Sequence, residues 1–106
     1  MPIARRGEIW QVDLGMVAKV RPAVILNVPF QDNERAVFEI VPHTTAIRGT
    51  RFEAAIAVPA LQEGAFDAPG LRNVPASVRL RRLGALTPAH LAQVATIALV
   101  FNSLHS

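Results

Sequence analysis

The alternation of apolar and polar positions predicts three strands in the first half of the chain. Residues 7–14, GEIWQVDL, alternate so that one face is largely apolar. Residues 21–28 predict a strand buried on both faces, which Pro22 should open because proline donates no ladder hydrogen bond. Residues 36–41, AVFEIV, predict a third strand that Pro42 ends. The polar cluster QDNE before it is typical of a turn and predicts an antiparallel hairpin.

The second half of the chain has weaker strand patterns and one clear helix. Residues 52–58, FEAAIAV, alternate and predict a fourth strand. Residues 59–76 are rich in glycine, proline and polar residues and predict a long loop with one short helical turn, and residues 77–83 predict a weak fifth strand. Thr87 is a good N-cap, and apolar residues recur at helical spacing after it, so we expect a helix over residues 88–104.

Together these elements predict one mainly β domain with α structure, spanning residues 1–106: a small, partly open barrel closed by the C-terminal helix. A chain of 106 residues, 51% apolar and 18% charged, has the size and composition of one folded domain. The helix is apolar on more than one side, which predicts a deep groove or a partner chain against it.

Composition and charge narrow the class of protein. The chain has no cysteine, and therefore no disulfide and no thiolate metal site. No apolar run approaches the roughly 20 residues that span a bilayer, and no secretory signal is visible, so we expect a cytoplasmic protein without membrane contact. Ten of the eleven cations are arginine, clustered beside turns and strand ends, and the planar guanidinium favours a polyanionic partner such as nucleic acid.

The candidate chemistry lies where the predicted hairpin brings two segments together. The segment VPHTTAIRGTR offers a histidine, two adjacent threonines and two arginines, although ordinary loop hydrogen bonding would explain the threonines alone. The hairpin places Arg21 beside residues 42–45. A cation next to a hydroxyl pair suits a phosphate whose negative charge grows during transfer. The histidines lack metal-ligand spacing, so we expect neither a metal nor a cofactor.

Four stretches resemble the MazF/PemK family of toxins: RRGEIWQVDLG at the first strand, KVRPAVIL at the second, VPHTT after the third, and RLGALTPAHLAQV at the final helix. The resemblance implies a small SH3-like barrel, a homodimer, a cognate antitoxin and sequence-specific, metal-independent cleavage of single-stranded RNA. The nucleophile would be the 2′-hydroxyl of the RNA, which leaves a 2′,3′-cyclic phosphate.

The resemblance also assigns roles to residues. Arg21 and Thr44 take the catalytic positions, where Arg21 stabilises the phosphorane and Thr44 binds a phosphate oxygen. We expect Lys19, His43, Thr45, Arg48, Arg51 and Glu8 to be supporting or RNA-binding residues; the resemblance carries over Thr45 and Arg48, whereas His43 replaces a residue that is usually aliphatic in the family. Two of these predictions have alternatives, because His43 is also explained as a core-edge histidine and Glu8 as part of a surface ion pair. The loop over residues 15–20 is shorter and poorer in glycine than in many members.

Two other functions remain open at this point. A CcdB-like toxin on the same fold binds DNA gyrase and cleaves nothing, but it has no need of an arginine and threonine pair. An inactive nucleic-acid-binding module would bind RNA without turnover. Trp10 could stack on a base, although burial in the sheet is the simpler interpretation of the single tryptophan.

Overall fold

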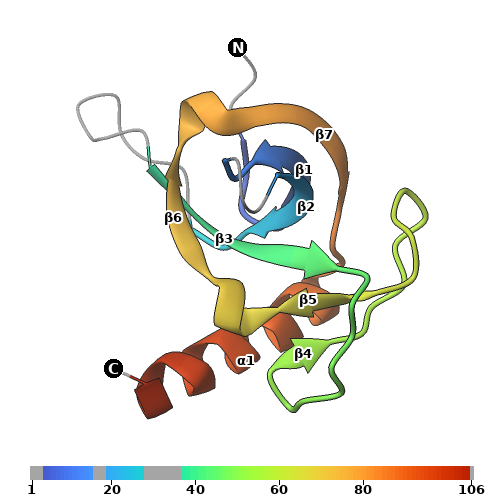
Figure 1. The fold of residues 1–106 in the computed structure, drawn as a ribbon, viewed down its shortest axis with the longest axis vertical. Coiled ribbons are helices and arrows are strands. Elements are labelled where there is room, and N and C mark those ends of the chain that lie inside the picture. Colours follow the sequence, from blue (N-terminus) through green and yellow to red (C-terminus); the bar gives the residue numbers. More distant parts are fainter. Residues whose placement is uncertain (1–3, 16–18, 28–36, 106) are drawn as a thin grey trace.

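The computed structural model describes residues 4–15, 19–27 and 37–105. Within these residues it has seven strands and one α-helix, which confirms the predicted mainly β chain with a C-terminal helix (Figure 1). The strands are β1 (Glu8–Asp13), β2 (Val20–Ile25), β3 (Val37–Thr44), β4 (Glu53–Ala54), β5 (Ala65–Asp67), β6 (Arg72–Pro75) and β7 (Arg79–Ala85), and the helix is α1 (Pro88–His105). Two 3₁₀ turns, η1 (Ala68–Gly70) and η2 (Ala76–Val78), flank β6.

The sheet is antiparallel and curls on itself. Its strand order is β4-β5-β3-β2-β1-β7, and β6 also pairs with β3. Figure 1 shows β6 and β7 curving around β1 and β2. In the described part of the chain, β6 and β7 are joined through η2 and share no ladder, so the barrel is partly open at that point.

Strand alternation divides the buried side chains into two clusters. Ile9, Val24 and Val41 belong to a cluster that packs against α1. Their neighbours Trp10, Ala23 and Ile40 point to the other face and fill the inside of the curled sheet. Because successive side chains point to opposite faces, each of these central strands contributes to both clusters.

Helix α1 confirms the predicted helix and its N-cap. The Oγ1 of Thr87 accepts a hydrogen bond from the backbone N–H of His90 at 3.1 Å. One side of the helix buries Leu91, Val94 and Ala98 against the sheet, whereas Leu99 on the other side is 68% exposed. No helix in the described residues is both long and apolar enough to cross a membrane.

The prediction that Pro22 opens the second strand was wrong. Strand β2 starts at Val20, and Pro22 is its third residue, paired with Gln11 of β1. The ladder to β3 begins only at Ala23, so Pro22 lies in a section that is paired on one side, where a missing donor is tolerated. Burial on both faces also begins only at Ala23, since Val20 and Arg21 are exposed.

The prediction that Pro42 ends the third strand was also wrong. Strand β3 continues through Pro42 to Thr44, and Pro42 pairs with Ala23 of β2. On its other side β3 pairs with β6 up to Ile40 and with β5 from His43 onward. Pro42 falls in the gap between these two partners, where no neighbouring strand requires its N–H.

The predictions for residues 52–85 need several corrections. The fourth strand has only two residues, Glu53–Ala54, and the segment predicted as a loop contains β5 and β6, so the predicted five strands become seven. The weak strand expected over residues 77–83 is β7, displaced by two residues. Backbone pairing with β3 and β4 overrides the unfavourable glycine and proline content here. The predicted turn at residues 31–34 lies outside the described residues.

Candidate active site

Arg21 and Thr44 lie just beyond the end of the β2–β3 ladder, at matching positions on the two strands. Ala23 pairs with Pro42, and the same antiparallel register continued by two residues sets Arg21 against Thr44. Residues two apart on a strand share a face, so Arg21, Thr44 and Pro42 all belong to one side of the sheet. The sequence prediction that the hairpin joins these two segments therefore agrees with the structure.

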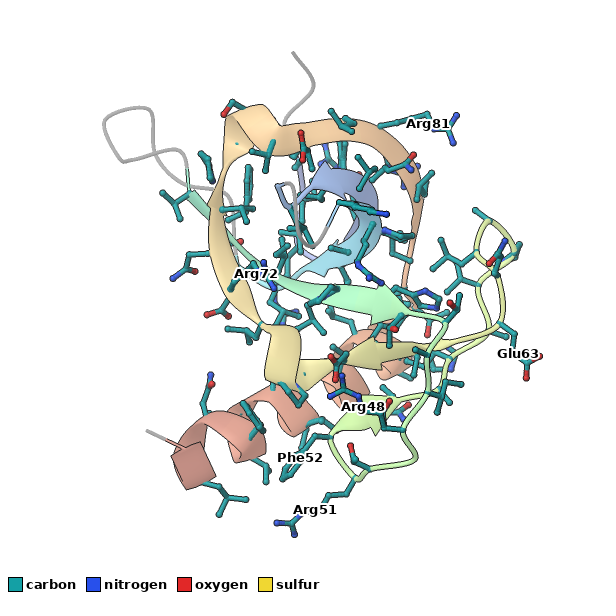
Figure 2. All side chains as sticks on the ribbon, in the orientation of Figure 1. Arg48, Arg51, Phe52, Glu63, Arg72 and Arg81 are labelled. Atoms are coloured by element: carbon teal, nitrogen blue, oxygen red, sulfur yellow. The ribbon has the colours of Figure 1, made fainter. Side chains whose placement is uncertain are left out.

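Arg21 and Thr44 line a hollow of about 300 Å³, which we call the Asp67 hollow. Three further cationic or acidic side chains, Arg48, Asp67 and Arg72, lie around it. The remaining lining residues are Leu14, Pro42, His43 and Gly70. Figure 2 shows Arg48 and Arg72 on the strands and loops that border β3. Three arginines and one carboxylate thus meet beside the Thr44 hydroxyl.

The Thr44 hydroxyl is held by its own backbone. Its Oγ1 accepts a hydrogen bond from the N–H of Ala46 at 3.0 Å. A hydroxyl has one proton to donate and two lone pairs to accept with, so this bond leaves the proton available to an oxygen in the hollow. The loop that carries Arg48 is fixed too, because Glu53 accepts from the backbone N–H groups of Arg48 at 2.9 Å and Thr50 at 2.7 Å.

The Asp67 hollow lies at a break in the edge of β3. His43 pairs with Phe66, and Ile40 pairs with Arg72. The two residues of β3 are three positions apart, whereas their partners are six positions apart. The three additional residues are those of η1, which bulges out opposite the gap at Pro42. Bulges of this kind are common next to active sites because they redirect side chains.

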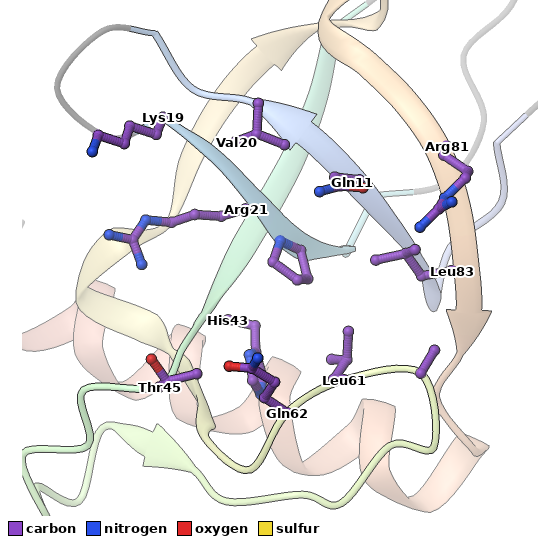
Figure 3. Close-up of a pocket in the computed structure, with 12 residues that line it drawn as sticks. Gln11, Lys19, Val20, Arg21, His43, Thr45, Leu61, Gln62, Arg81 and Leu83 are labelled. Atoms are coloured by element: carbon purple, nitrogen blue, oxygen red, sulfur yellow. The ribbon is translucent and has the colours of Figure 1, made fainter.

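A second hollow, of about 450 Å³, lies on the other side of Arg21, and we call it the Gln62 hollow. It shares Arg21 and His43 with the Asp67 hollow. Its other lining residues are Gln11, Lys19, Val20, Pro22, Thr45, Ala60, Leu61, Gln62, Arg81 and Leu83. Figure 3 shows the side chains of Lys19 and Arg21 extending to the same side of β2.

His43 is held inside the protein between these hollows. Its side chain is 3% exposed and meets Phe66 edge to face, with ring centroids 5.1 Å apart. Its Nε2 is buried and has no hydrogen-bond partner in the described residues. Burial lowers the pKa of His43 below its ordinary value, so the ring is neutral near pH 7. The interpretation as a core-edge histidine agrees with this environment.

Asp67 lies in a less polar environment than a surface carboxylate. Burial raises the pKa of Asp67 above its ordinary value, the Glu53 carboxylate raises it further and Arg48 opposes the rise. Arg72 is oriented by its Nε, which donates to the carbonyl oxygen of Gly70 at 3.3 Å.

Two predicted supporting residues lie away from both hollows. Arg51 is exposed and covers the ring of Phe52 at 4.8 Å, and it points away from the sheet in Figure 2. Glu8 forms a salt bridge with Arg82 at 2.8 Å and also accepts from the indole N–H of Trp10. Burial opposes the ionisation of Glu8, but these bonds and the Arg5 backbone N–H lower its pKa overall.

Lys19, Thr45 and Arg48 line the hollows, and their supporting or RNA-binding role stays a prediction. Trp10 is buried in the core. The sequence prediction missed the lining residues Gln11, Asp67, Arg72 and Arg81. Arg81 is one of the arginines clustered beside turns and strand ends, whereas Asp67 and Arg72 lie in the segment predicted as a loop. In the described part of the chain, no three His, Asp or Glu side chains gather as a metal site would require.

Comparison with known proteins identifies the family. A family model described as "PemK-like, MazF-like toxin of type II toxin-antitoxin system" matches residues 5–101. The chain belongs to this toxin family. No curated protein matches the sequence of this PemK/MazF-like toxin.

Solved structures share the fold of this PemK/MazF-like toxin at low sequence identity. An endoribonuclease from a mycobacterial species, solved in complex with its cognate antitoxin, is 22% identical with a TM-score of 0.81, and the match covers 95% of this chain and 96% of that one. MazF from Deinococcus radiodurans is 17% identical with a TM-score of 0.82, covering 97% and 99%. The Mycobacterium tuberculosis toxin MazF-mt6 is 22% identical with a TM-score of 0.72, covering 90% and 96%.

Proposed function

We propose that this toxin is a sequence-specific endoribonuclease that cleaves single-stranded RNA without a metal ion. The observation that carries the proposal is that Arg21 and Thr44 line one hollow together with two more arginines. The family match and the shared fold with a mycobacterial endoribonuclease support it. A gyrase-binding toxin would not need this arrangement of cations and a hydroxyl.

The chemistry is a transfer of phosphate within the RNA. The 2′-oxygen attacks the neighbouring phosphorus, a 2′-O–P bond forms, and the bond from phosphorus to the 5′-oxygen breaks. The proton lost by the 2′-hydroxyl is balanced by the proton gained by the 5′-oxygen. The products are a 2′,3′-cyclic phosphate and a 5′-hydroxyl, so neither water nor a cofactor is consumed in this step.

Arg21 and Thr44 act on the charge that develops during this transfer. The planar guanidinium of Arg21 offers several N–H donors to the phosphorane oxygens. The hydroxyl of Thr44 donates its proton to one of those oxygens, since its acceptor side is engaged by Ala46. Donors fixed before the reaction stabilise the transition state without reorganising, which is the largest catalytic effect in many enzymes.

The cations around the two hollows bind the RNA backbone. Lys19 and Arg81 line the Gln62 hollow, and Arg48 and Arg72 line the Asp67 hollow. A third hollow shares Arg72 and Leu14 with the Asp67 hollow and extends the groove along β6. Charged contacts of this kind make the affinity for RNA fall steeply with salt.

The same proposal includes protein partners in the cytoplasm. The exposed apolar side of α1, with Leu99, Val100 and Leu104, suits a homodimer contact or a cognate antitoxin. A mycobacterial structure with this fold contains its cognate antitoxin, which supports the second partner.

The test is incubation of the purified protein with a long single-stranded RNA in EDTA, followed by analysis of the cut ends. We expect discrete cuts that carry 2′,3′-cyclic phosphate. Arg21→Ala should lower kcat/KM at least a hundredfold. Arg51→Ala is the matched control, because it removes the same charge from a site outside both hollows, and it should cleave nearly as well as the original protein.

Absence of cuts across RNAs of several sequences would reject the endoribonuclease proposal. Cuts that Arg21→Ala still makes at full rate would reject the assigned site. Inhibition of DNA gyrase without cleavage of RNA would instead favour the CcdB-like function.

A further inference from the structure

Asp67 is unexpected in a site that must accept phosphate. It shares the Asp67 hollow with three arginines and Thr44, yet its negative charge repels the phosphate that they would bind. It is placed there by the sheet: Asp67 pairs with Glu53 of β4, and its neighbour Ala65, two residues away on the same face, pairs with Thr44. The carboxylate therefore belongs to the same face as the predicted catalytic pair.

Among the described residues, the favourable charge interaction of the Asp67 carboxylate is with Arg48 alone. Its carboxylate makes no hydrogen bond or salt bridge to any residue that the structure describes. It precedes η1 but does not cap that turn with its side chain. Burial raises its pKa, so keeping this carboxylate here lowers the stability of the fold.

A glycine allows η1 to pack closely against the Pro42 ring beside Asp67. A Cβ on Gly70 would lie 2.7 Å from Cγ of Pro42 and 3.5 Å from Oδ2 of Asp67. Any larger residue would therefore collide with the Pro42 ring and crowd the carboxylate oxygen. Pro42, Asp67 and Gly70 thus form part of the wall of the same hollow that Arg21 and Thr44 line.

A nucleobase has the chemistry that fits this space beside a phosphate. A carboxylate only accepts hydrogen bonds, so its partner must offer N–H groups. Guanine presents N1–H and N2–H₂ side by side on its Watson–Crick edge, which matches the two carboxylate oxygens. Uracil offers one N–H between two carbonyls, and adenine and cytosine place a ring lone pair beside their amino group, so each of them repels part of the carboxylate.

We propose that the Asp67 hollow binds a guanine next to the scissile phosphate and that Asp67 reads its N1–H and N2–H₂ groups. This rests on the proposed function, because it takes RNA as the ligand. The guanidinium of Arg72, which Gly70 orients, lies in the same hollow and stacks on or donates to the base. Asp67 thereby makes guanine part of the cleavage sequence.

The experiment measures binding of single-stranded octamers of 2′-deoxyuridine that contain one 2′-deoxyguanosine, 2′-deoxyinosine or 2′-deoxyadenosine, called the guanine, inosine and adenine octamers. These probes lack the 2′-hydroxyl and cannot be cleaved by the proposed reaction. Inosine lacks only the 2-amino group of guanine. We expect the guanine octamer to bind about tenfold more tightly than the other two, as for a bidentate base contact.

Asp67→Asn should remove this preference and bind all three octamers at least as tightly as the original protein binds inosine, because a charge that repels phosphate has gone. Glu63→Gln is the matched control: it removes an exposed carboxylate outside the Asp67 hollow, so the preference for guanine should remain. Thermal unfolding of both variants checks that they fold.

Equal binding of guanine and inosine by the original protein would overturn the inference, as would a preference that Asp67→Asn retains. An assay of RNA cleavage distinguishes failure of the guanine inference from failure of the proposed function. Cuts without a guanine preference reject only the base-reading role of Asp67. Guanine-selective binding that Asp67→Asn abolishes, without any cut in RNA, rejects only the nuclease.

Discussion

Two adjacent residues of β3, His43 and Thr44, lie in opposite environments beside Arg21. His43 is buried against Phe66 and has an unpartnered nitrogen in the described structure, whereas Thr44 keeps a hydroxyl at the edge of the Asp67 hollow. Strand alternation alone separates them, because neighbours on a strand point to opposite faces. We therefore propose that Thr44, which shares the Asp67 hollow with Arg21, takes part in cleavage and that buried His43 does not.

The largest effect should separate Thr44 from Thr45. Thr44→Val should lower kcat/KM for RNA cleavage about a hundredfold, since it removes a donor to the developing charge. Thr45→Val, whose side chain lines the Gln62 hollow, should change it only a few-fold. Steady-state kinetics on one fluorogenic RNA measure both, and Thr44→Ser should restore most of the activity.

Thr44→Val also removes the hydrogen bond from Ala46, which costs about 1 kcal/mol of stability. Assays well below the unfolding temperature keep this loss out of the kinetic comparison. Equal losses in Thr44→Val and Thr45→Val would contradict the division between the two hollows.

The packing around His43 should be the next most sensitive feature. A Cβ on Gly64 would collide with the carbonyl oxygen of Thr44 and lie 2.7 Å from Cε1 of His43. Gly64→Ala should lower the free energy of unfolding by about 1–3 kcal/mol, as overpacking does. Gly84→Ala is the control, because a Cβ there meets nothing within 4 Å. Urea denaturation of both variants measures the difference in the free energy of unfolding. Equal midpoints would contradict the close packing around His43.

His43 should make the stability of the protein depend on pH. Its pKa is lowered in the folded state from the ordinary value of 6.5, so below that pH the unfolded chain binds a proton more readily. The contribution of neutral His43 to the free energy of unfolding is therefore fully present above pH 6.5 and is lost as the pH falls below that value. The urea midpoint should fall more between pH 7.5 and pH 5 in the original protein than in His43→Gln.

The same variant tests whether His43 takes part in cleavage. We expect the pH–rate profile of His43→Gln to keep the shape of the original profile, at a moderately reduced rate. Loss of one limb of that profile would assign His43 a role in proton transfer and would remove the contrast between residues 43 and 44.

The smallest effect should come from the Glu8–Arg82 ion pair, which lies outside both hollows. Arg82 is largely exposed, so Arg82→Ala should cost less than about 1 kcal/mol of stability and leave cleavage unchanged. Glu8→Ala should cost more, because Glu8 also accepts from the Arg5 backbone and from Trp10. Thermal unfolding at low and high salt measures the stability loss of both variants. A large loss of RNA cleavage in Arg82→Ala would instead place the ion pair in the RNA interface.

The parts of the site that could be predicted from the sequence are those that depend on strand order and alternation. An apolar strand, a polar turn cluster and a second strand predict a hairpin, and the hairpin alone brings Arg21 near Thr44. The N-cap at Thr87 predicted α1 in the same local way. The catalytic assignment of both residues stays a prediction that comes from the family resemblance.

Asp67 and Arg72 could not be predicted because their strands are not defined by local sequence. Strand β5 has three residues and β6 has four, and both lie among glycines and prolines. Both become strands by pairing with β3, an interaction between residues more than 20 positions apart, and β5 pairs with β4 as well. Pro42 misled the prediction for a related reason, since whether it ends a strand depends on what lies beside it.

Pro42 also has a consequence for how the edge of β3 can be used. Because it has no amide hydrogen, an extended peptide laid across the gap between β5 and β6 would find no donor at this residue. The gap therefore resists closure by strand addition, whether from this chain or from another. The covalent structure of one side chain keeps the Asp67 hollow open to a ligand that is not a β-strand.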